Sequence, residues 1–150
     1  MFRHNNHYTQ LPKIRVDFIF KDDLITRIQL SNAEAFSINS EHPQVLKWVD
    51  AYLRREEMPS LPLCFNGMTP FTQKVLKTLM ETKEPISYSE LARKAGHPNA
   101  QRAVGGVMNH NPFPLVIPCH RVITSTGDIG GYAYGIELKR HLLQFEGFFL

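Results

Sequence analysis

The sequence predicts an α+β protein in which a small N-terminal sheet and one helix precede a mostly helical region. Apolar and polar residues alternate over residues 14–30, and this period of two is typical of half-buried strands. From residue 43 onward, apolar residues recur at helical spacing instead. A proline-rich break at 58–62 follows the first helical stretch, because proline removes an amide donor and fixes φ. We therefore predict an N-terminal α/β region over residues 1–60 and a second region over residues 61–150.

The composition is that of an ordinary soluble globular protein, with 43% hydrophobic and 21% charged residues among 150. No apolar run approaches the roughly 20 residues that span a membrane, and the first residues do not resemble a secretory signal. We therefore expect a cytoplasmic protein without membrane association, in which Cys64 and Cys119 stay reduced. We expect no cofactor and no metal site, since His4 and His7 lack accompanying ligands.

The N-terminal region is expected to contain a β-hairpin followed by one helix. The alternating residues 14–20 and 24–30 flank a polar turn at 21–23. Pro43 is expected to begin a helix that ends near Leu53, because proline is favoured in the first helical turn. The apolar residues expected to be buried on this helix are Val45, Leu46, Val49, Tyr52 and Leu53.

The second region is predicted to be winged-helix-like and to carry a helix-turn-helix. Thr69 before Pro70 is a typical helix start, followed by an apolar face made of Phe71, Val75, Leu76, Leu79 and Met80. Two short helices are then predicted over 87–95 and 99–109, with a glycine-containing turn between them. An ordinary pair of packed helices is the alternative interpretation.

The second of these short helices has an unusual composition. Arg102 is followed by Gly105 and Gly106, and each interior glycine weakens a helix by about 1 kcal/mol. Close approach to another helix would explain the glycines. Close approach to DNA would also explain them, because a helix about 10 Å wide hardly fits a minor groove about 6 Å wide.

The last predicted helix runs over 136–145, with Leu138, Leu142 and Phe145 on one stripe. Glu146 follows this helix and precedes Gly147, a residue type that often caps helix ends. A carboxylate at this end opposes the helix dipole, so we expect Glu146 to have a specific partner. The alternative is a glutamate exposed to solvent.

Cys119 and His120 are adjacent in a segment with apolar residues on both sides. A reactive cysteine needs thiolate character, which a neighbouring imidazole can promote. A buried structural thiol beside a surface histidine is the alternative for an isolated Cys-His pair.

Three ordered motifs favour the reactive interpretation. They are Asn-Pro-Phe-Pro at 111–114, Pro-Cys-His-Arg-Val at 118–122 and Gly-Gly-Tyr-Ala-Tyr-Gly at 130–135. Together they resemble the active-site region of the O6-alkylguanine-DNA alkyltransferases, over about residues 68–147. The resemblance implies a monomer that binds double-stranded DNA containing O6-alkylguanine through the minor groove. It also implies a single, irreversible transfer of the alkyl group from guanine O6 to the protein's own cysteine, with O4 of thymine as a second candidate target.

The resemblance implies a catalytic role for each of five residues. Cys119 accepts the alkyl group after His120 deprotonates it through a water molecule, and Glu146 orients His120. Tyr88 donates a hydrogen bond to purine N3 as negative charge develops there. Asn111 ties the DNA-recognition helix to the cysteine segment.

The resemblance also implies eight residues that bind DNA or the extruded base. Arg102 fills the gap left by the rotated nucleotide, and Gln101 and Thr72 contact DNA. The base pocket is expected to include Pro114, Val122, Tyr132, Ala133 and Tyr134. Tyr134 departs from the family, since many relatives have glycine there, and its ring is expected to narrow the alkyl pocket.

Three other functions fit parts of the sequence. A Cys-His hydrolase would attack an acyl group, turn over and need an oxyanion hole. A binding module that recognises damaged bases without repairing them would lack the nucleophile that Cys119 provides. A plain winged-helix DNA-binding protein would not account for Cys119, His120 and Glu146 occurring together.

Overall fold

An antiparallel hairpin of β1 (Ile14–Lys21) and β2 (Leu24–Asn32) forms the N-terminal part of the fold. The computed structural model describes residues 10–150. Asp22 and Asp23 connect the strands with φ angles of 51° and 66°, and two-residue hairpin loops favour such positive values. The predicted hairpin is therefore confirmed, and its alternation buries Ile14, Val16, Phe18, Ile28 and Leu30.

The sheet has a third strand that the sequence analysis did not predict. β3 (Ser37–Ile38) pairs in parallel with β1, which gives the strand order β2-β1-β3. α1 (Pro43–Leu53) follows with the predicted bounds. Its buried residues are Val45, Trp48, Val49 and Tyr52, which share one helix face. The prediction that Leu46 is buried was wrong: the residue is 45% exposed, because it lies one position off that face. Leu53 is half-buried.

The chain returns to the hairpin directly after the proline-rich break. The Ile25 amide donates to the Pro62 carbonyl at 2.7 Å, and the Cys64 amide donates to the Ile25 carbonyl at 2.9 Å. α2 (Pro70–Met80) then begins at Thr69, whose hydroxyl accepts from the Thr72 amide at 3.1 Å as the sequence predicts. Met80, predicted on the apolar face, is 39% exposed at the end of this helix. The division into 1–60 and 61–150 remains a prediction.

Two short helices pack together after α2. α3 (Tyr88–Lys94) is capped by Ser87, and α4 (Gln101–Asn109) follows a turn that contains Gly96 and Asn99. The second helix begins at Gln101, later than the predicted residue 99. Asn99 has a φ of 71°, and this left-handed conformation cannot continue into a right-handed helix. Beside the helices, β4 (Ile86–Ser87) pairs in parallel with β5 (Val122–Ile123).

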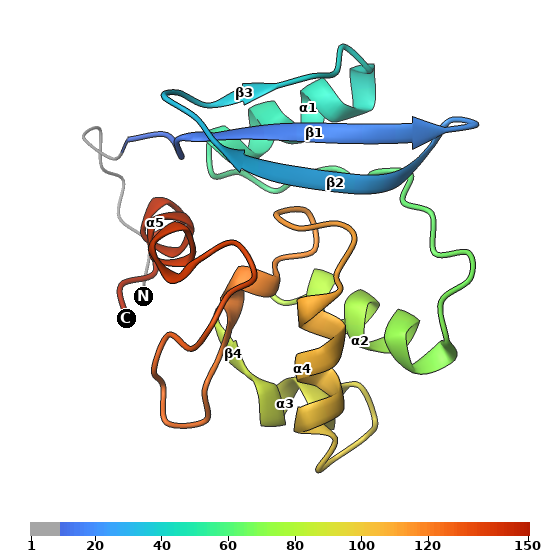
Figure 1. Ribbon diagram of the computed structural model, residues 1–150, viewed down its shortest axis with the longest axis vertical. Coiled ribbons are helices and arrows are strands. Elements are labelled where there is room, and N and C mark those ends of the chain that lie inside the picture. The colour runs from blue at the N-terminus through green and yellow to red at the C-terminus, as the bar shows by residue number, and fades with distance from the viewer. Residues whose placement is uncertain (1–9) are drawn as a thin grey trace.

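The segment between α4 and β5 runs through the core. Phe113 and Ile117 are fully buried, and the short 3-10 helix η1 (Cys119–Arg121) follows. α5 (Ile136–Phe145) packs against η1 and ends at Glu146, followed by Gly147 with a φ of 94°. The N-terminal sheet lies along one side of the helical region (Figure 1). These elements form the predicted α+β architecture. No helix in residues 10–150 is long and apolar enough to cross a membrane.

Candidate active site

Cys119 lies at the first position of η1, between the core segment and β5. It is 7% exposed, and its amide donates to the Ile117 carbonyl at 2.7 Å. Asn111 donates from Nδ2 to the same carbonyl at 2.9 Å and accepts from the Phe113 amide at 2.9 Å. The Cys119 amide and the side chain of Asn111, which lies just after α4, therefore donate to the same carbonyl group.

A buried carboxylate lies behind the cysteine. Glu146 is 1% exposed, and its Oε2 lies 2.6 Å from Nε2 of the fully buried His120. The same oxygen accepts from the Tyr52 hydroxyl at 2.7 Å, while Oε1 accepts from Arg121 Nε at 2.7 Å. Three donors from α1 and η1 thus satisfy a carboxylate at the end of α5. The predicted partner of Glu146 is present.

The electrostatic environment keeps Glu146 ionised. Burial alone would raise its pKa, but attraction to His120 and Arg121, with hydrogen bonds from His120 and Tyr52, lowers the pKa to about 2. Burial and the neighbouring Glu146 raise the pKa of Tyr52 well above its usual value. This hydroxyl therefore stays protonated and donates a hydrogen bond to Glu146.

The geometry assigns different functions to the two nitrogens of His120. Nε2 faces an ionised carboxylate and therefore carries a hydrogen. Nδ1 is buried and has no hydrogen-bond partner among the described residues. In the neutral imidazole, Nδ1 is the acceptor and can take a proton from a nearby acid directly or through one water molecule.

The thiol of Cys119 is protonated in the resting site. Burial raises its pKa, although the Asn111 side chain, the charge of Lys139 and the Tyr132 hydroxyl act in the opposite direction. A buried thiol of this kind needs a base before it can act as a nucleophile. His120, the next residue of η1, is the candidate for that base, because its Nδ1 is buried and has no hydrogen-bond partner among the described residues.

Lys139 is a buried cation that the sequence analysis did not single out. It is fully buried on α5, and Nζ donates to the carbonyls of Val122 and Gly131 at 2.7 and 2.8 Å. Burial lowers its pKa to about 8, and the nearby Cys119 opposes that shift. Lys139 therefore links β5 to the loop before α5 and places positive charge near the thiol. It also occupies one acceptor position of the Val122 carbonyl.

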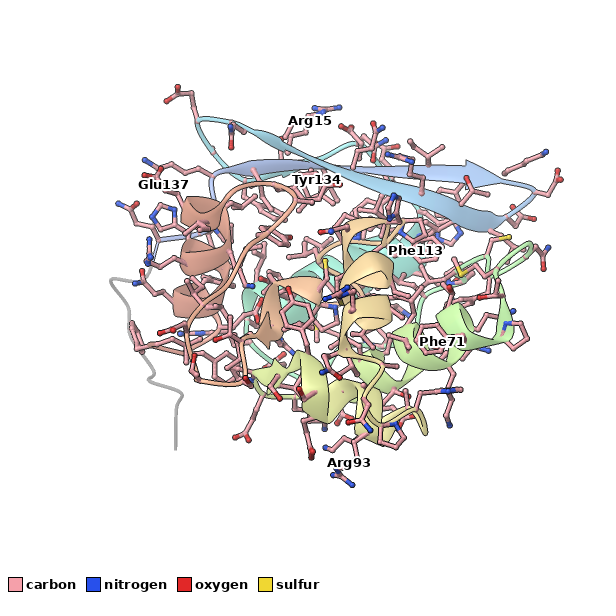
Figure 2. The ribbon with its side chains drawn as sticks, turned by 60° about the horizontal axis from the view of Figure 1, so that its bottom comes forward. Arg15, Phe71, Arg93, Phe113, Tyr134 and Glu137 are labelled. Atoms are coloured by element: carbon pink, nitrogen blue, oxygen red, sulfur yellow. The ribbon has the colours of Figure 1, made fainter. Side chains whose placement is uncertain are left out.

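Aromatic side chains surround the thiol. The Tyr132 ring lies 6.4 Å from the His120 ring and 5.6 Å from the Tyr134 ring, measured between centroids. Burial and then the neighbouring Cys119 raise the pKa values of Tyr88 and Tyr134, so both side chains lie near the thiol. Tyr134 lies under the N-terminal sheet (Figure 2). Pro114 is buried and Ala133 is exposed.

The exposed face of α4 carries the predicted DNA-binding residues. Gln101 and Arg102 line a surface hollow of about 810 Å³ together with Tyr88, Gly105 and Gly106. Among the described residues, a side-chain carbon added at either glycine would meet nothing within 4 Å outside the helix's own backbone. Close approach to another helix of this chain therefore does not explain the glycines.

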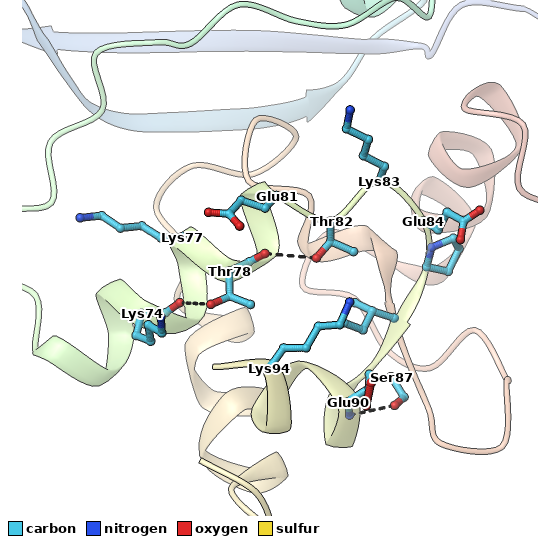
Figure 3. A pocket seen from close by; sticks show the side chains of 12 residues that line it. Lys74, Lys77, Thr78, Glu81, Thr82, Lys83, Glu84, Ser87, Glu90 and Lys94 are labelled. Carbon is cyan, nitrogen blue, oxygen red and sulfur yellow. Dashed lines mark hydrogen bonds between the residues drawn. The ribbon is translucent and has the colours of Figure 1, made fainter. Parts of the chain in front are cut away.

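Thr72 lines a separate, smaller hollow between α2 and α4, with Ala103 and Gly106 on its α4 side. Another surface hollow, of about 1050 Å³, lies between the end of α2 and α3 (Figure 3). It is lined by four lysines and three glutamates, so its charges nearly balance, and none of the predicted site residues lines it.

The fold brings several predicted site residues to the region of the thiol and places others on the exposed faces of α2 and α4. Tyr88, Asn111, Tyr132 and Tyr134 lie near the thiol, and His120 follows Cys119 in η1 with Glu146 bonded to its Nε2. Tyr88 also lines the hollow beside α4. The residues on the exposed faces of α2 and α4 are Thr72, Gln101 and Arg102.

Three residues of the site were missed as site residues. Arg121 follows the Cys-His pair directly. Lys139 lies three residues before the buried Leu142, so a charged residue at a buried helix position could have indicated Lys139. Tyr52 was predicted only as a core residue. No group of three potential metal ligands occurs within residues 10–150, and His4 and His7 lie outside the described residues.

Comparison with known proteins gives one consistent result. Residues 70–148 match the family model described as the DNA-binding domain of 6-O-methylguanine DNA methyltransferase. A methylated-DNA–protein-cysteine methyltransferase from Methanothermobacter thermautotrophicus is 35% identical over 145 residues, which cover 91% of this chain and 81% of the relative. The human protein of the same name is 42% identical over 113 residues, which cover 69% of this chain and only 55% of the human protein.

The fold has a close structural counterpart. A crystal structure of Mycobacterium tuberculosis OGT in complex with DNA superposes with a TM-score of 0.71 at 29% sequence identity. The match covers 89% of this chain and 92% of that chain, so it includes the N-terminal region as well as the helical one. The predicted α+β fold class is confirmed.

The buried Glu146 predicts a specific loss of stability in acid. Its pKa is lowered from 4.5 to about 2, so its contribution to the free energy of unfolding is complete above pH 4.5 and is lost as the pH falls toward 2. The full effect is about 3 kcal/mol. Urea unfolding of the wild-type protein at several pH values should show this decline, and Glu146→Gln should flatten it. An equally steep decline in the variant would contradict the assignment.

Proposed function

Because the chain belongs to the family of the methylated-DNA–protein-cysteine methyltransferases, we propose that it repairs DNA by moving an alkyl group from guanine O6 to Cys119. One observation carries this proposal. The buried thiol lies beside a histidine whose Nε2 is held by an ionised carboxylate and whose Nδ1 is free to accept a proton. We further propose that O4 of thymine is a second target and that the protein acts as a cytoplasmic monomer.

The transfer is a displacement at the alkyl carbon. The thiol proton passes to Nδ1 of His120, through a bridging water molecule, while Glu146 stabilises the resulting imidazolium. The thiolate then forms a sulfur–carbon bond as the bond between that carbon and O6 breaks, and the electron pair stays on the purine. Tyr88 donates a hydrogen bond to N3, where negative charge develops. Guanine takes up a proton on its ring as the imidazolium of His120 gives up the proton that it received. The products are guanine and an S-alkylcysteine beside a neutral His120.

The reaction ends with an inactive protein. A thioether on Cys119 has no good leaving group, so each protein molecule acts once. The transfer needs no cofactor, because the thiol and the alkylated base supply every atom of the products. The base is expected to lie against Pro114, Tyr132 and Ala133, with backbone groups of Cys119 and Val122 reading its edge. Asn111 ties the DNA-facing helix to this pocket.

The target nucleotide has to leave the duplex, because O6 cannot be reached inside the base stack. We propose that α3, the turn and α4 act as a helix-turn-helix whose second helix enters the minor groove. The open space beside Gly105 and Gly106 supports this, since small side chains reduce the widening that a helix requires. Arg102 would occupy the gap in the stack, and Gln101 and Thr72 would contact DNA nearby.

The alternative of a Cys-His hydrolase is disfavoured by the backbone at the nucleophile. Acyl transfer commonly uses the amide of the nucleophilic residue in the oxyanion hole, but the Cys119 amide already donates to the Ile117 carbonyl. A binding module without repair activity is disfavoured by the presence of Cys119 itself. A plain DNA-binding protein would not require the buried His120–Glu146 pair.

The first prediction of the proposed function concerns the residue that accepts the alkyl group. After incubation with duplex containing O6-methylguanine, intact-mass measurement should find one added methyl group, and peptide mapping should place it on Cys119. Cys119→Ser should abolish transfer while DNA binding is kept, because an alcohol is a poor nucleophile at neutral pH. Cys64→Ser is the matched control and should react like the wild type. A methyl group on Cys64, or no methyl group at all, would contradict the proposal.

A second prediction concerns Arg102. Arg102→Ala should slow repair of duplex DNA by at least about tenfold, because unstacking the nucleotide costs a few kcal/mol, but it should barely slow the reaction with free O6-alkylguanine base. Arg140→Ala removes the same charge from the exposed surface of α5 and controls for general electrostatics. Single-turnover rates are compared at one salt concentration. Equal losses on both substrates would rule out the insertion role.

A third prediction concerns the size of the alkyl group. The partly buried Tyr134 ring packs on Tyr132 and faces the thiol region, which supports a narrowed pocket. Tyr134→Gly should accelerate transfer of a benzyl group by about tenfold and leave methyl transfer nearly unchanged, because excluded volume affects only the larger adduct. Tyr134→Phe keeps the ring and should behave like the wild type. Unchanged benzyl rates in Tyr134→Gly would refute the pocket argument.

A further inference from the structure

Tyr52 joins the N-terminal region to the buried carboxylate. It lies on α1, 94 positions before Glu146 in the chain, and its hydroxyl donates to Oε2 at 2.7 Å. Its ring is stacked on Trp48 at 5.2 Å with an interplanar angle of 8°, and it packs on Phe145 at 5.5 Å. The side chain is 3% exposed. Packing therefore fixes the ring, and the ring fixes the position of the hydroxyl.

The hydrogen bonds at Glu146 are unevenly distributed between its two oxygens. Oε1 accepts from Arg121, whereas Oε2 accepts from both Tyr52 and His120. Tyr52 and His120 therefore share one acceptor atom. Without the tyrosine hydroxyl, Oε2 could turn about the side-chain torsion of Glu146 and would no longer be held against Nε2 of His120.

We propose that Tyr52 is a positioning residue of the alkyl transfer, which holds Glu146 Oε2 against Nε2 of His120. This inference rests on the proposed function, because it assigns Tyr52 to the same reaction. The N-terminal region thereby contributes a side chain to the active site. A second contact also joins the N-terminal region to the segment after α4: the Ile28 amide of β2 donates to the Pro112 carbonyl at 2.8 Å.

The charge balance around the pair shows how removal of the hydroxyl would act. The titratable and charged groups that face it are Arg121 and Cys119 on η1, Tyr52 on α1 and Tyr132 in the loop before α5, with Lys139 of α5 beyond the thiol. Removing one donor from Oε2 changes both the position of the carboxylate and the hydrogen bonding that it offers to Nε2 of His120. Because His120 receives the thiol proton, the rate and its dependence on pH should both change.

The test is a pH profile of single-turnover methyl transfer to Tyr52→Phe from duplex containing O6-methylguanine. Phenylalanine keeps the stacked ring and removes only the hydroxyl. The rate at neutral pH should fall by on the order of tenfold, as is typical when an orienting partner is lost. The shape of the profile should also change. Val45→Ala, a core change on the same helix away from the carboxylate, should lower stability and leave the shape of the profile unchanged.

A double-mutant cycle distinguishes an effect through Glu146 from a general loss of packing. In a Glu146→Gln background, Tyr52→Phe should change the rate far less than it does in the wild type, because the carboxylate that transmits the effect is absent. A uniform loss at every pH, equal losses in both backgrounds, or a wild-type profile in Tyr52→Phe would overturn the inference alone. Absence of transfer by the wild-type protein would instead overturn the proposed function, and this inference with it.

Discussion

The arrangement of the active site depends on one buried carboxylate. Taking the Glu146 charge out of water costs several kcal/mol unless donors surround it, and here Arg121, His120 and Tyr52 supply them. These donors come from α1 and η1, while the carboxylate ends α5. Satisfying the charge therefore requires these three elements to meet at one point. The orientation of His120 follows from that requirement, because its Nε2 can reach the carboxylate in only one ring orientation.

Glu146 and Cys119 are both buried, but burial has opposite outcomes for their protonation states. The charged partners of Glu146 outweigh burial, so the carboxylate stays ionised, whereas burial dominates at Cys119, so the thiol stays protonated. A protonated, shielded thiol resists oxidation and indiscriminate alkylation. It becomes a nucleophile only when a proton can move to Nδ1 of His120. The site thus combines a resting state of low reactivity with a base that is already oriented.

Local patterns predicted the elements and residues whose signals lie close together in the chain. The hairpin followed from its period of two, α2 from Thr69 and Pro70, and the partner of Glu146 from a charge that opposes a helix dipole. The sequence offered no such signal for β3, which is too short to show a period, or for the return of residues 62–64 to β2. Tyr52 has an ordinary core position on α1. Its function depends on a partner 94 residues away, which no local pattern contains.

α4, the helix proposed to bind DNA, is connected to Cys119 through one carbonyl group. Gly105 and Gly106 weaken α4 by about 1 kcal/mol each and leave open space beside it, so the benefit of these residues lies in a contact outside the chain. Just beyond α4, Asn111 donates to the Ile117 carbonyl, and Cys119 donates its amide to that same carbonyl. Asn111 also accepts from the Phe113 amide, and Phe113 is fully buried. In the proposed function, a force on α4 from a widened minor groove would pass through these short hydrogen bonds to Cys119, the proposed alkyl acceptor.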